Sequence, residues 1–275
     1  MSADLGSWVD GVESRALAAD DRGLQYGDGV FETLLVRGRR ARFLDAHLAR
    51  LATGLERLGI LFDAWEALRA DLDRAMDRAP PLAVMKIIVT RGSGLRRGYS
   101  PRDCTAGRRI VMLFAASPSP DFSAGVDLRI ATIRLAAQPA LAGLKHLNRL
   151  ENVLATMEPG HDAHFESLLV GASGDLVGGT MSNVFAVHDR TVSTPPIVDA
   201  GVAGIMRGIV LRECAGLGFT AQERRLTPAD LTSADEVFIT NARLGVVPAR
   251  RLREHAFRMR DTALRLRTHI EALDA

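Results

Sequence analysis

Hydrophobic residues in the first 115 positions recur with two different spacings. Four leucines lie three or four residues apart, namely Leu48, Leu51, Leu55 and Leu58. This spacing predicts a helix that Asp45 caps and Gly59 ends. A second helical pattern covers 64–76 and stops at Pro80-Pro81. Continuous apolar runs rich in β-branched residues predict buried strands, at 30–36, 84–90 and 109–115.

The second half of the chain mixes strand and helix patterns in an irregular order. Strands are predicted at 126–135, 166–171, 184–188 and 236–240, and helices at 148–157, 204–216 and 257–273. Thr227 followed by Pro228 predicts the start of a short helix, with threonine as the cap. Regular strand–helix alternation and a Gly-x-Gly-x-x-Gly turn are both missing from the sequence, which argues against a Rossmann domain.

A serine- and proline-rich stretch at 116–125 separates the two halves. We therefore predict an α+β protein with a small N-terminal α/β domain at 1–117, a linker at 118–125, and a larger C-terminal α/β domain at 126–275. At 275 residues the chain is long enough for two such cores.

Composition narrows the classes of function. The net charge is +2 and aromatic residues make up 5%, so a nucleic-acid stacking surface is not expected. We predict no membrane segment, because no run approaches the roughly 18 apolar residues that a spanning helix needs. The N-terminus lacks a secretory pattern, and Cys104 and Cys214 fit reduced thiols, so we expect a cytoplasmic protein. No cysteine–histidine spacing suggests a metal.

Lysine is rare in this chain. Lysine and arginine together number 35, and only Lys86 and Lys145 are lysines. Arginine cannot form an imine, whereas a lysine whose amine is desolvated can. Lys145 stands among small and apolar residues that would lower the pKa of an amine. Lys86 is a less favoured candidate, because a lysine within a strand more often extends toward the surface.

A second set of residues suits a phosphate group. Gly201 and Gly204 precede a predicted helix, whose free N–H groups and dipole favour an anion. Arg50 offers a cationic ligand, and Thr240-Asn241 follows a predicted strand. An imine-forming lysine together with a phosphate cradle is the minimum equipment of a pyridoxal-phosphate enzyme.

Seven motifs occur in the order found in fold-type IV pyridoxal-phosphate enzymes, which the chain resembles over nearly its whole length. They are Tyr26-Gly-Asp-Gly-Val-Phe-Glu-Thr33, His47-Leu-Ala-Arg50, Arg91-Gly-Ser-Gly, Gly143-Leu-Lys145-His-Leu-Asn-Arg-Leu-Glu-Asn152, Ser182-Asn183, Gly204-Ile-Met-Arg207 and Thr240-Asn241. The fold implied is that of the D-amino-acid and branched-chain aminotransferases. The Lys145 motif most resembles that of the aminodeoxychorismate lyases.

The resemblance implies a role for each matching residue. Lys145 is the catalytic residue and carries pyridoxal 5'-phosphate, whose phosphate would meet Arg50, Ile205, Met206, Thr240 and Asn241. Tyr26, Phe31, Thr33, Arg91 and Tyr99 would lie near the substrate. Arg91, Arg96, Arg97 and Arg149 are candidate partners for substrate carboxylates. The family also implies a homodimer. Glu151 and Asn152 are expected to orient the helix after Lys145.

Gly178 departs from the family pattern. Five residues before Asn183 the family usually has a glutamate that keeps the pyridine nitrogen of the cofactor protonated, and this chain has glycine. Three explanations stay open: another acid such as Asp175 replaces it, the lyase reaction tolerates a weaker electron sink, or the chain has lost cofactor chemistry.

The resemblance implies a carbon–oxygen lyase of folate synthesis. Such an enzyme converts the small molecule 4-amino-4-deoxychorismate to 4-aminobenzoate and pyruvate, with the Lys145 amine as general base. One alternative is an aminotransferase of the same fold, for D-amino acids or branched-chain amino acids. The other is a cofactor-free, catalytically silent homologue that acts as a binding module.

Overall fold

The computed structural model describes residues 4–94, 98–104 and 106–273. The chain forms two compact units. The first unit consists of Met1–Pro118 together with Leu144–Asn148, and the second consists of Ser119–Gly143 with Arg149–Ala275. The domain prediction had assigned the Lys145 segment to the C-terminal part, whereas residues 144–148 pack with the first unit.

The first unit is built on a six-stranded antiparallel sheet in the order β2-β1-β6-β5-β3-β4. The strands are β1 (Asp4–Val9), β2 (Val12–Glu13), β3 (Gly29–Arg37), β4 (Arg40–Ala41), β5 (Leu82–Thr90) and β6 (Arg108–Ala115). β3 and β5 pair along their whole length, from Gly29 opposite Thr90 to Arg37 opposite Leu82. This register decides which side chains share a face of the sheet.

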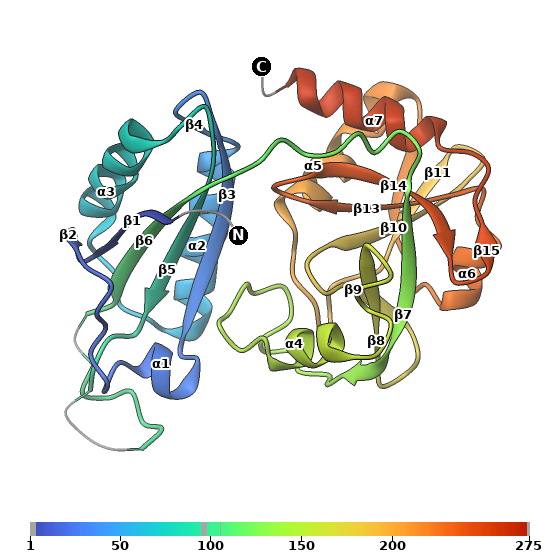
Figure 1. Ribbon diagram of the computed structural model, residues 1–275. Coiled ribbons are helices and arrows are strands. Elements are labelled where there is room, and N and C mark those ends of the chain that lie inside the picture. The colour runs from blue at the N-terminus through green and yellow to red at the C-terminus, as the bar shows by residue number, and fades with distance from the viewer. Residues whose placement is uncertain (1–3, 95–97, 105, 274–275) are drawn as a thin grey trace. The chain divides into compact units, whose positions relative to one another are not determined.

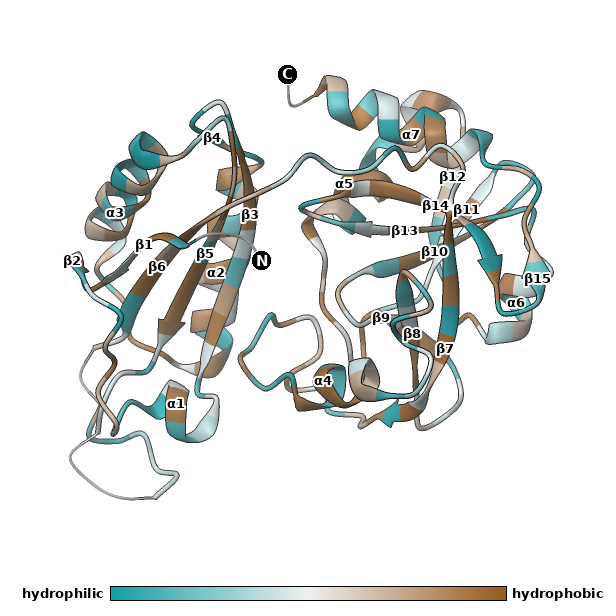
Figure 2. Cartoon of the chain, viewed as in Figure 1, coloured by the Kyte–Doolittle hydropathy of each residue, from teal (hydrophilic) through white to brown (hydrophobic). Residues whose placement is uncertain are grey.

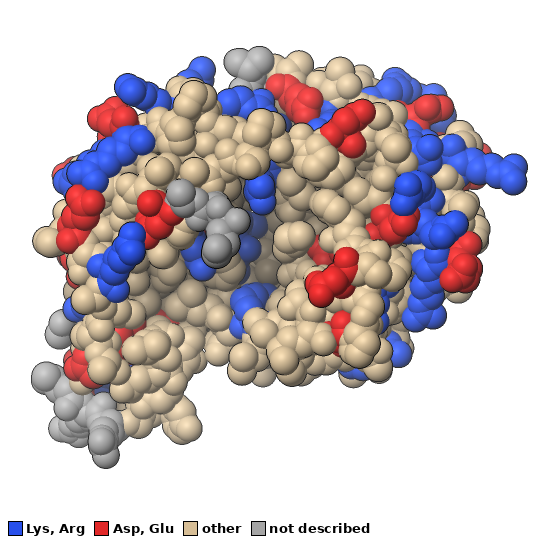
Figure 3. Space-filling view, viewed as in Figure 1, with Lys and Arg blue, Asp and Glu red and all other residues tan. Residues whose placement is uncertain are grey.

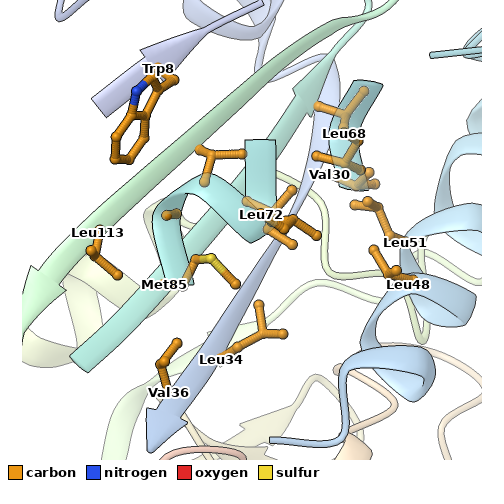
Figure 4. Packing of buried hydrophobic residues seen from close by; sticks show 14 of the residues in the cluster. Trp8, Val30, Leu34, Val36, Leu48, Leu51, Leu68, Leu72, Met85 and Leu113 are labelled. Atoms are coloured by element: carbon orange, nitrogen blue, oxygen red, sulfur yellow. The ribbon is translucent and has the colours of Figure 1, made fainter. Parts of the chain in front are cut away.

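Helices α2 (Leu44–Leu58) and α3 (Trp65–Arg78) pack on one face of this sheet (Figure 1). Alternate residues of β3 meet leucines of α2 in a single core (Figure 4), and β5 and β6 carry hydrophobic runs (Figure 2). The core residues from β3 and α2 are Val30, Leu34, Val36, Leu48, Leu51 and Leu55. The intervening residues of β3, among them Phe31 and Thr33, therefore point to the opposite face.

The structure confirms the predicted C-terminal end of the first long helix and corrects its N-terminal end. Gly59 caps the C-terminus in the left-handed conformation, as predicted, and its N–H donates to the carbonyl of Glu56. The prediction that Asp45 is the N-cap is wrong, because the cap is Phe43, two residues earlier, and the helix begins at Leu44. Asp45 stands in the first turn, where its charge suits the helix dipole.

The second unit contains a curled, mixed sheet. Its main path has the order β12-β11-β10-β13-β14-β7-β8-β9, and β15 (His255–Ala256) pairs with β14. The strands of the path are β7 (Val126–Leu135), β8 (Glu166–Gly171), β9 (Leu176–Gly179), β10 (Asn183–His188), β11 (Thr191–Thr194), β12 (Thr220–Glu223), β13 (Glu236–Asn241) and β14 (Gly245–Leu252). β9 also approaches β10, which curls the sheet.

Helices pack against this sheet. α5 (Ile205–Glu213) packs against β13, α7 (Asp261–Ala272) lies against β13 and β14, and α4 (Leu150–Met157) lies against β7 and β8. A 3₁₀ turn, Ala215–Leu217, follows α5. The short α6 (Pro228–Thr232) begins as predicted, with Thr227 accepting from the Asp230 N–H in a capping box.

The strands predicted at 126–135 and 166–171 are confirmed at those residues. The sequence analysis missed the short strands β9, β11 and β12 and the longer β14. The first three have only four residues each, too few to show a clear alternation of polar and apolar positions.

Candidate active site

Lys145 is held against the start of β3 by backbone hydrogen bonds. The Phe31 N–H donates to the Lys145 carbonyl at 2.9 Å, and the Leu147 N–H donates to the Gly29 carbonyl at 3.0 Å. Val30 and His146 also form a β-bridge. The segment therefore lies beside β3 like a short extra strand. This pairing places the Lys145 ammonium nitrogen 4.2 Å from the centre of the Phe31 ring.

Lys86, the other lysine of the chain, lies at the same ring. Its nitrogen is 5.1 Å from the centre of Phe31. Lys86 is on β5 directly opposite Thr33 of β3, so Phe31, Thr33 and Lys86 share one face of the sheet. Burial lowers the pKa of Lys86 below its ordinary value. Two amines and one aromatic ring thus form a cluster that the sequence analysis did not predict.

Glu32 of β3 points the other way, toward α2, where it meets Arg50 and His47. Its carboxylate accepts from Arg50 Nε at 2.8 Å and from Arg50 Nη2 at 2.5 Å, and it lies 2.6 Å from His47 Nδ1. Burial alone would raise the pKa of Glu32, but the bonds from Arg50 and His47 hold it below its ordinary value. Burial lowers the pKa of His47, against the influence of Glu32.

The N-terminus of α5 forms a cradle for an anion in the second unit. Gly204 is the N-cap and contributes no side-chain cap, so the first N–H groups of the helix, including those of Ile205 and Met206, point outward. A Cβ at position 204 would collide with the Asn183 amide oxygen. Glycine is thus required for Asn183 to pack against the helix start, where it also donates to the Val202 carbonyl at 3.0 Å.

Thr240 adds a hydroxyl donor to the same unit. It lies on β13 opposite Asn183, and its Oγ1 is buried without a partner among the described residues. Asn241 accepts from the N–H groups of Arg243 and Leu244 and so shapes the turn after β13. A buried hydroxyl without a partner and a helix N-terminus without a side-chain cap fit a bound phosphate.

Three residues predicted to lie near the substrate are found close to the N-terminal end of β3, namely Tyr26, Arg91 and Tyr99. Tyr26 is in the short helix α1 (Arg22–Tyr26), and its ring is 5.3 Å from that of Tyr99, which is 84% exposed. Arg91 donates to Asp28 and to the carbonyls of Leu58 and Gly59, so its donors serve the structure of the unit.

Three further arginines were candidate partners for substrate carboxylates, namely Arg96, Arg97 and Arg149. Arg149 is half-buried at the start of α4, and burial lowers its pKa to about 10. Arg96 and Arg97 lie outside the described residues.

The helix after Lys145 is oriented as predicted, because Glu151 accepts from the Ala136 N–H and Asn152 donates to the Thr180 carbonyl.

Gly178 is buried on β9, with main-chain atoms of the following segment close to its Cα. A Cβ at this position would lie 2.8 Å from the Ser182 carbonyl oxygen, a distance that needs a shift of the main chain. Asp175 is already engaged, because it accepts from Arg225 at 2.7 Å and from Ser173 at 3.0 Å. These bonds lower the pKa of Asp175.

The sequence analysis also missed a buried acid in the second unit. Glu166 of β8 is fully buried and accepts bonds from the main chain or hydroxyls of Ser167, Thr180, Met181 and Ser182. It fixes the turn between β9 and β10 that leads to Asn183. Only its position at the start of an apolar strand could have identified it from the sequence.

Charge of both signs is spread over the face of the molecule that Figure 3 shows. On the face shown in Figure 3, acidic and basic side chains are interspersed, in keeping with the net charge of +2. Among the described residues, no helix combines the length and apolar character needed to cross a bilayer.

Comparison with known proteins agrees with these features. The model of the family "Amino-transferase class IV" matches residues 29–252. Over 246 residues the chain is 36% identical to the aminodeoxychorismate lyase of Vibrio harveyi, covering 88% of this chain and 89% of that protein. A putative branched-chain-amino-acid aminotransferase of Methanocaldococcus jannaschii is 31% identical over 248 residues, covering 88% of this chain and 84% of the relative.

A solved structure is similar over almost the full length. The 4-amino-4-deoxychorismate lyase of Pseudomonas aeruginosa is 42% identical, with a TM-score of 0.89, covering 98% of this chain and all of that one. Because the family model spans most of the chain and relatives above 30% identity are covered nearly end to end, this chain belongs to the amino-transferase class IV family.

Proposed function

We propose that this chain is a pyridoxal-phosphate-dependent 4-amino-4-deoxychorismate lyase, which produces 4-aminobenzoate and pyruvate for folate synthesis. The observation that carries the proposal is that both lysines of the chain meet at Phe31, at 4.2 and 5.1 Å from its ring centre. One amine serves the covalent chemistry and the other offers a positive charge to an anionic substrate. The identities of 36% and 42% to two lyases support the same reading.

Different residues of the chain would bind different parts of the cofactor. When bound, pyridoxal 5'-phosphate would supply an electron-accepting ring. The Lys145 amine is the group that would hold it. The groups of the second unit that would bind its phosphate are the N–H groups of Ile205 and Met206, the Thr240 hydroxyl and the turn at Asn241. The buried Thr240 Oγ1, which has no protein partner among the described residues, supports this assignment. In the first unit, Arg50 is the residue that the family resemblance assigns to the phosphate.

Lys145 then acts on the substrate as a base. Its amine would serve as the general base that removes the proton from the ring carbon that bears nitrogen. The electrons of that C–H bond form a ring double bond, and the ether C–O bond breaks. The enolpyruvyl group departs with the electron pair and takes up a proton to become pyruvate, which leaves an aromatic ring.

Lys86 is the residue we propose for a substrate carboxylate. The substrate has two carboxylates, and a partly buried ammonium binds such a group more strongly than an exposed one. Phe31 and Thr33 share its face of the sheet and form the wall beside it. Tyr26, Tyr99 and Arg91 remain proposed substrate-side residues, with Arg91 acting through Asp28 rather than by direct contact.

Gly178 favours the lyase over the aminotransferase. Elimination is driven by formation of an aromatic ring, whereas amino transfer depends on a protonated pyridine in both half-reactions. A chain without an acid at position 178, and with Asp175 paired to Arg225, therefore suits the elimination better.

The test is a pair of assays on the purified protein. Incubation with 4-amino-4-deoxychorismate and pyridoxal phosphate should release pyruvate with no keto acid present. Amino transfer that requires a keto acid, without pyruvate release, would instead establish the aminotransferase. If pyridoxal phosphate produces no visible absorption band, the cofactor-free alternative holds.

We also propose a homodimer in the cytoplasm. The support for the dimer is an exposed apolar stripe on one side of α4, formed by Leu150, Val153, Leu154 and Met157. These residues are 47–76% exposed, and an isologous interface would bury the stripes of two copies together. Two cysteines without a disulfide suit a reducing compartment.

A further inference from the structure

Glu32 occupies a position that the pattern of β3 assigns to the hydrophobic core. Val30 and Leu34, two residues before and after it, belong to the core cluster, and Glu32 itself is 1% exposed. A carboxylate buried at such a position is retained only where its partners satisfy it. Its partners here are Arg50 and His47, both on α2.

The contact between Glu32 and Arg50 fixes the orientation of the guanidinium. Nε of Arg50 donates to one carboxylate oxygen and Nη2 donates to the other, in a two-pronged pairing. Such paired bonds restrict both the position and the plane of the guanidinium. Arg50 is itself only 13% exposed, so the ion pair is largely shielded from solvent.

His47 is fixed by the same carboxylate. Because the Glu32 carboxylate is ionised, the His47 Nδ1 at 2.6 Å donates its proton, and Nε2 becomes the acceptor. That Nε2 is buried without a partner among the described residues. Burial is the main cause that lowers the pKa of His47, and the charges of Arg50 and Lys145 act in the same direction.

We propose that Glu32 is a positioning residue, whose carboxylate locks Arg50 in the orientation that receives the cofactor phosphate. This inference rests on the proposed function, which assigns Arg50 to the phosphate. The negative charge of Glu32 weakens the overall attraction of the site for an anion, so its contribution is geometric: Arg50 is held in place before the phosphate arrives.

Selectivity for phosphate distinguishes this role from a general structural one. The experiment compares the affinity of the protein for pyridoxal phosphate with that for pyridoxal, which lacks the phosphate, by absorbance titration. The Glu32→Gln variant keeps the size of the side chain and removes its charge. Its Kd for pyridoxal phosphate should rise about tenfold while its Kd for pyridoxal stays the same.

Asp71→Asn provides a matched control in the same unit. Asp71 is 2% exposed and pairs with Arg109 at 2.7 Å and with Arg74 at 3.2 Å, so it too is a buried acid held by arginine. It takes no part in the proposed site. Its substitution should lower the melting temperature and leave the ratio of the two affinities unchanged.

The Glu32→Asp and Arg50→Lys variants keep the proposal testable if Glu32→Gln does not fold. Each retains charge but breaks the two-pronged pairing, and each should show the same phosphate-selective loss. Equal weakening for both ligands, or no weakening, overturns the positioning role, as does a wild-type protein that binds the two ligands equally. Pyruvate release by the wild type decides the proposed function separately.

Discussion

The main-chain N–H of Phe31 donates to the carbonyl of Lys145, so the lysine backbone is tied to the strand whose ring its side chain faces. The amine and the ring are positioned by one β-like pairing rather than by separate loops. The position of the amine therefore depends on the backbone of β3.

This backbone pairing leads to the first prediction. Lys145→Ala should keep the pairing with β3, because the carbonyl that accepts from Phe31 is retained, and it should release no pyruvate above background. Borohydride treatment of the wild type with pyridoxal phosphate, followed by mass mapping, should place the adduct on the peptide containing Lys145. An adduct on Lys86 instead would reverse the roles of the two lysines.

Lys86 should affect substrate binding and leave covalent attachment intact. Lys86→Met removes one charge-assisted bond to a carboxylate, worth about 1.5–3 kcal/mol, which predicts a rise in KM of roughly 10- to 100-fold. Lys86→Arg should recover part of the loss because the charge returns. Steady-state pyruvate release measures both variants. A variant Lys86→Met with normal KM and reduced kcat would contradict a binding role.

His47 should make the protein sensitive to mild acid. Its pKa is lowered in the folded state from an ordinary value of 6.5, so below pH 6.5 the unfolded chain binds a proton that the folded chain does not. Stability therefore falls as the pH drops below 6.5, by up to about 1.4 kcal/mol per pH unit. Lys145, Arg50 and Glu32 are the charged groups that act on it.

Replacing His47 by asparagine, whose amide can still donate to Glu32, should remove this slope. Urea unfolding of the wild type and the variant at pH 7.5 and 5.5 provides the comparison. The lowered pKa of Glu32 adds a separate loss as the pH falls below 4.5. An identical pH dependence in both proteins would show that His47 is not the titrating group.

Two glycines should respond in opposite ways to alanine. At Gly178 a Cβ meets the Ser182 carbonyl at 2.8 Å, so Gly178→Ala should be destabilising, by about 1–3 kcal/mol for an overpacked core position. Gly208 lies within α5 and a Cβ there meets nothing within 4 Å. Gly208→Ala should therefore stabilise the protein by about 0.5–1 kcal/mol. Thermal unfolding distinguishes the two, and a stable Gly178→Ala would mean that the β9–β10 turn can open.

The apolar stripe of α4 should control assembly. Leu150 and Met157 are 76% and 72% exposed, and the double substitution Leu150→Glu, Met157→Glu should give a monomer by sedimentation. Leu61 is 69% exposed elsewhere, so Leu61→Glu is the matched control and should leave the dimer intact. A dimer that survives the double substitution would place the interface on another surface.

Much of the fold followed from local patterns. The strand at 126–135 and the cap at Gly59 were predicted correctly, since an apolar run and a glycine act on their immediate neighbours. The order of the motifs along the chain, from Tyr26 to Asn241, indicates the family without reference to the fold. Asp45 was misplaced because helix ends are decided by the packing of the flanking chain as much as by the capping residue.

The residue types that carry the chemistry can be read from the sequence alone: the two lysines, the glycine-led helix start and the missing acid at Gly178. Which of these residues meet depends on the folded arrangement of the strands and helices. Strand register brought Lys86 beside Thr33, and long-range pairing brought Lys145 to Phe31. The same packing engaged Arg91 with Asp28 and placed Glu32 behind Arg50. Spacing along the chain predicts a local conformation, whereas contacts between distant residues depend on how whole strands and helices align.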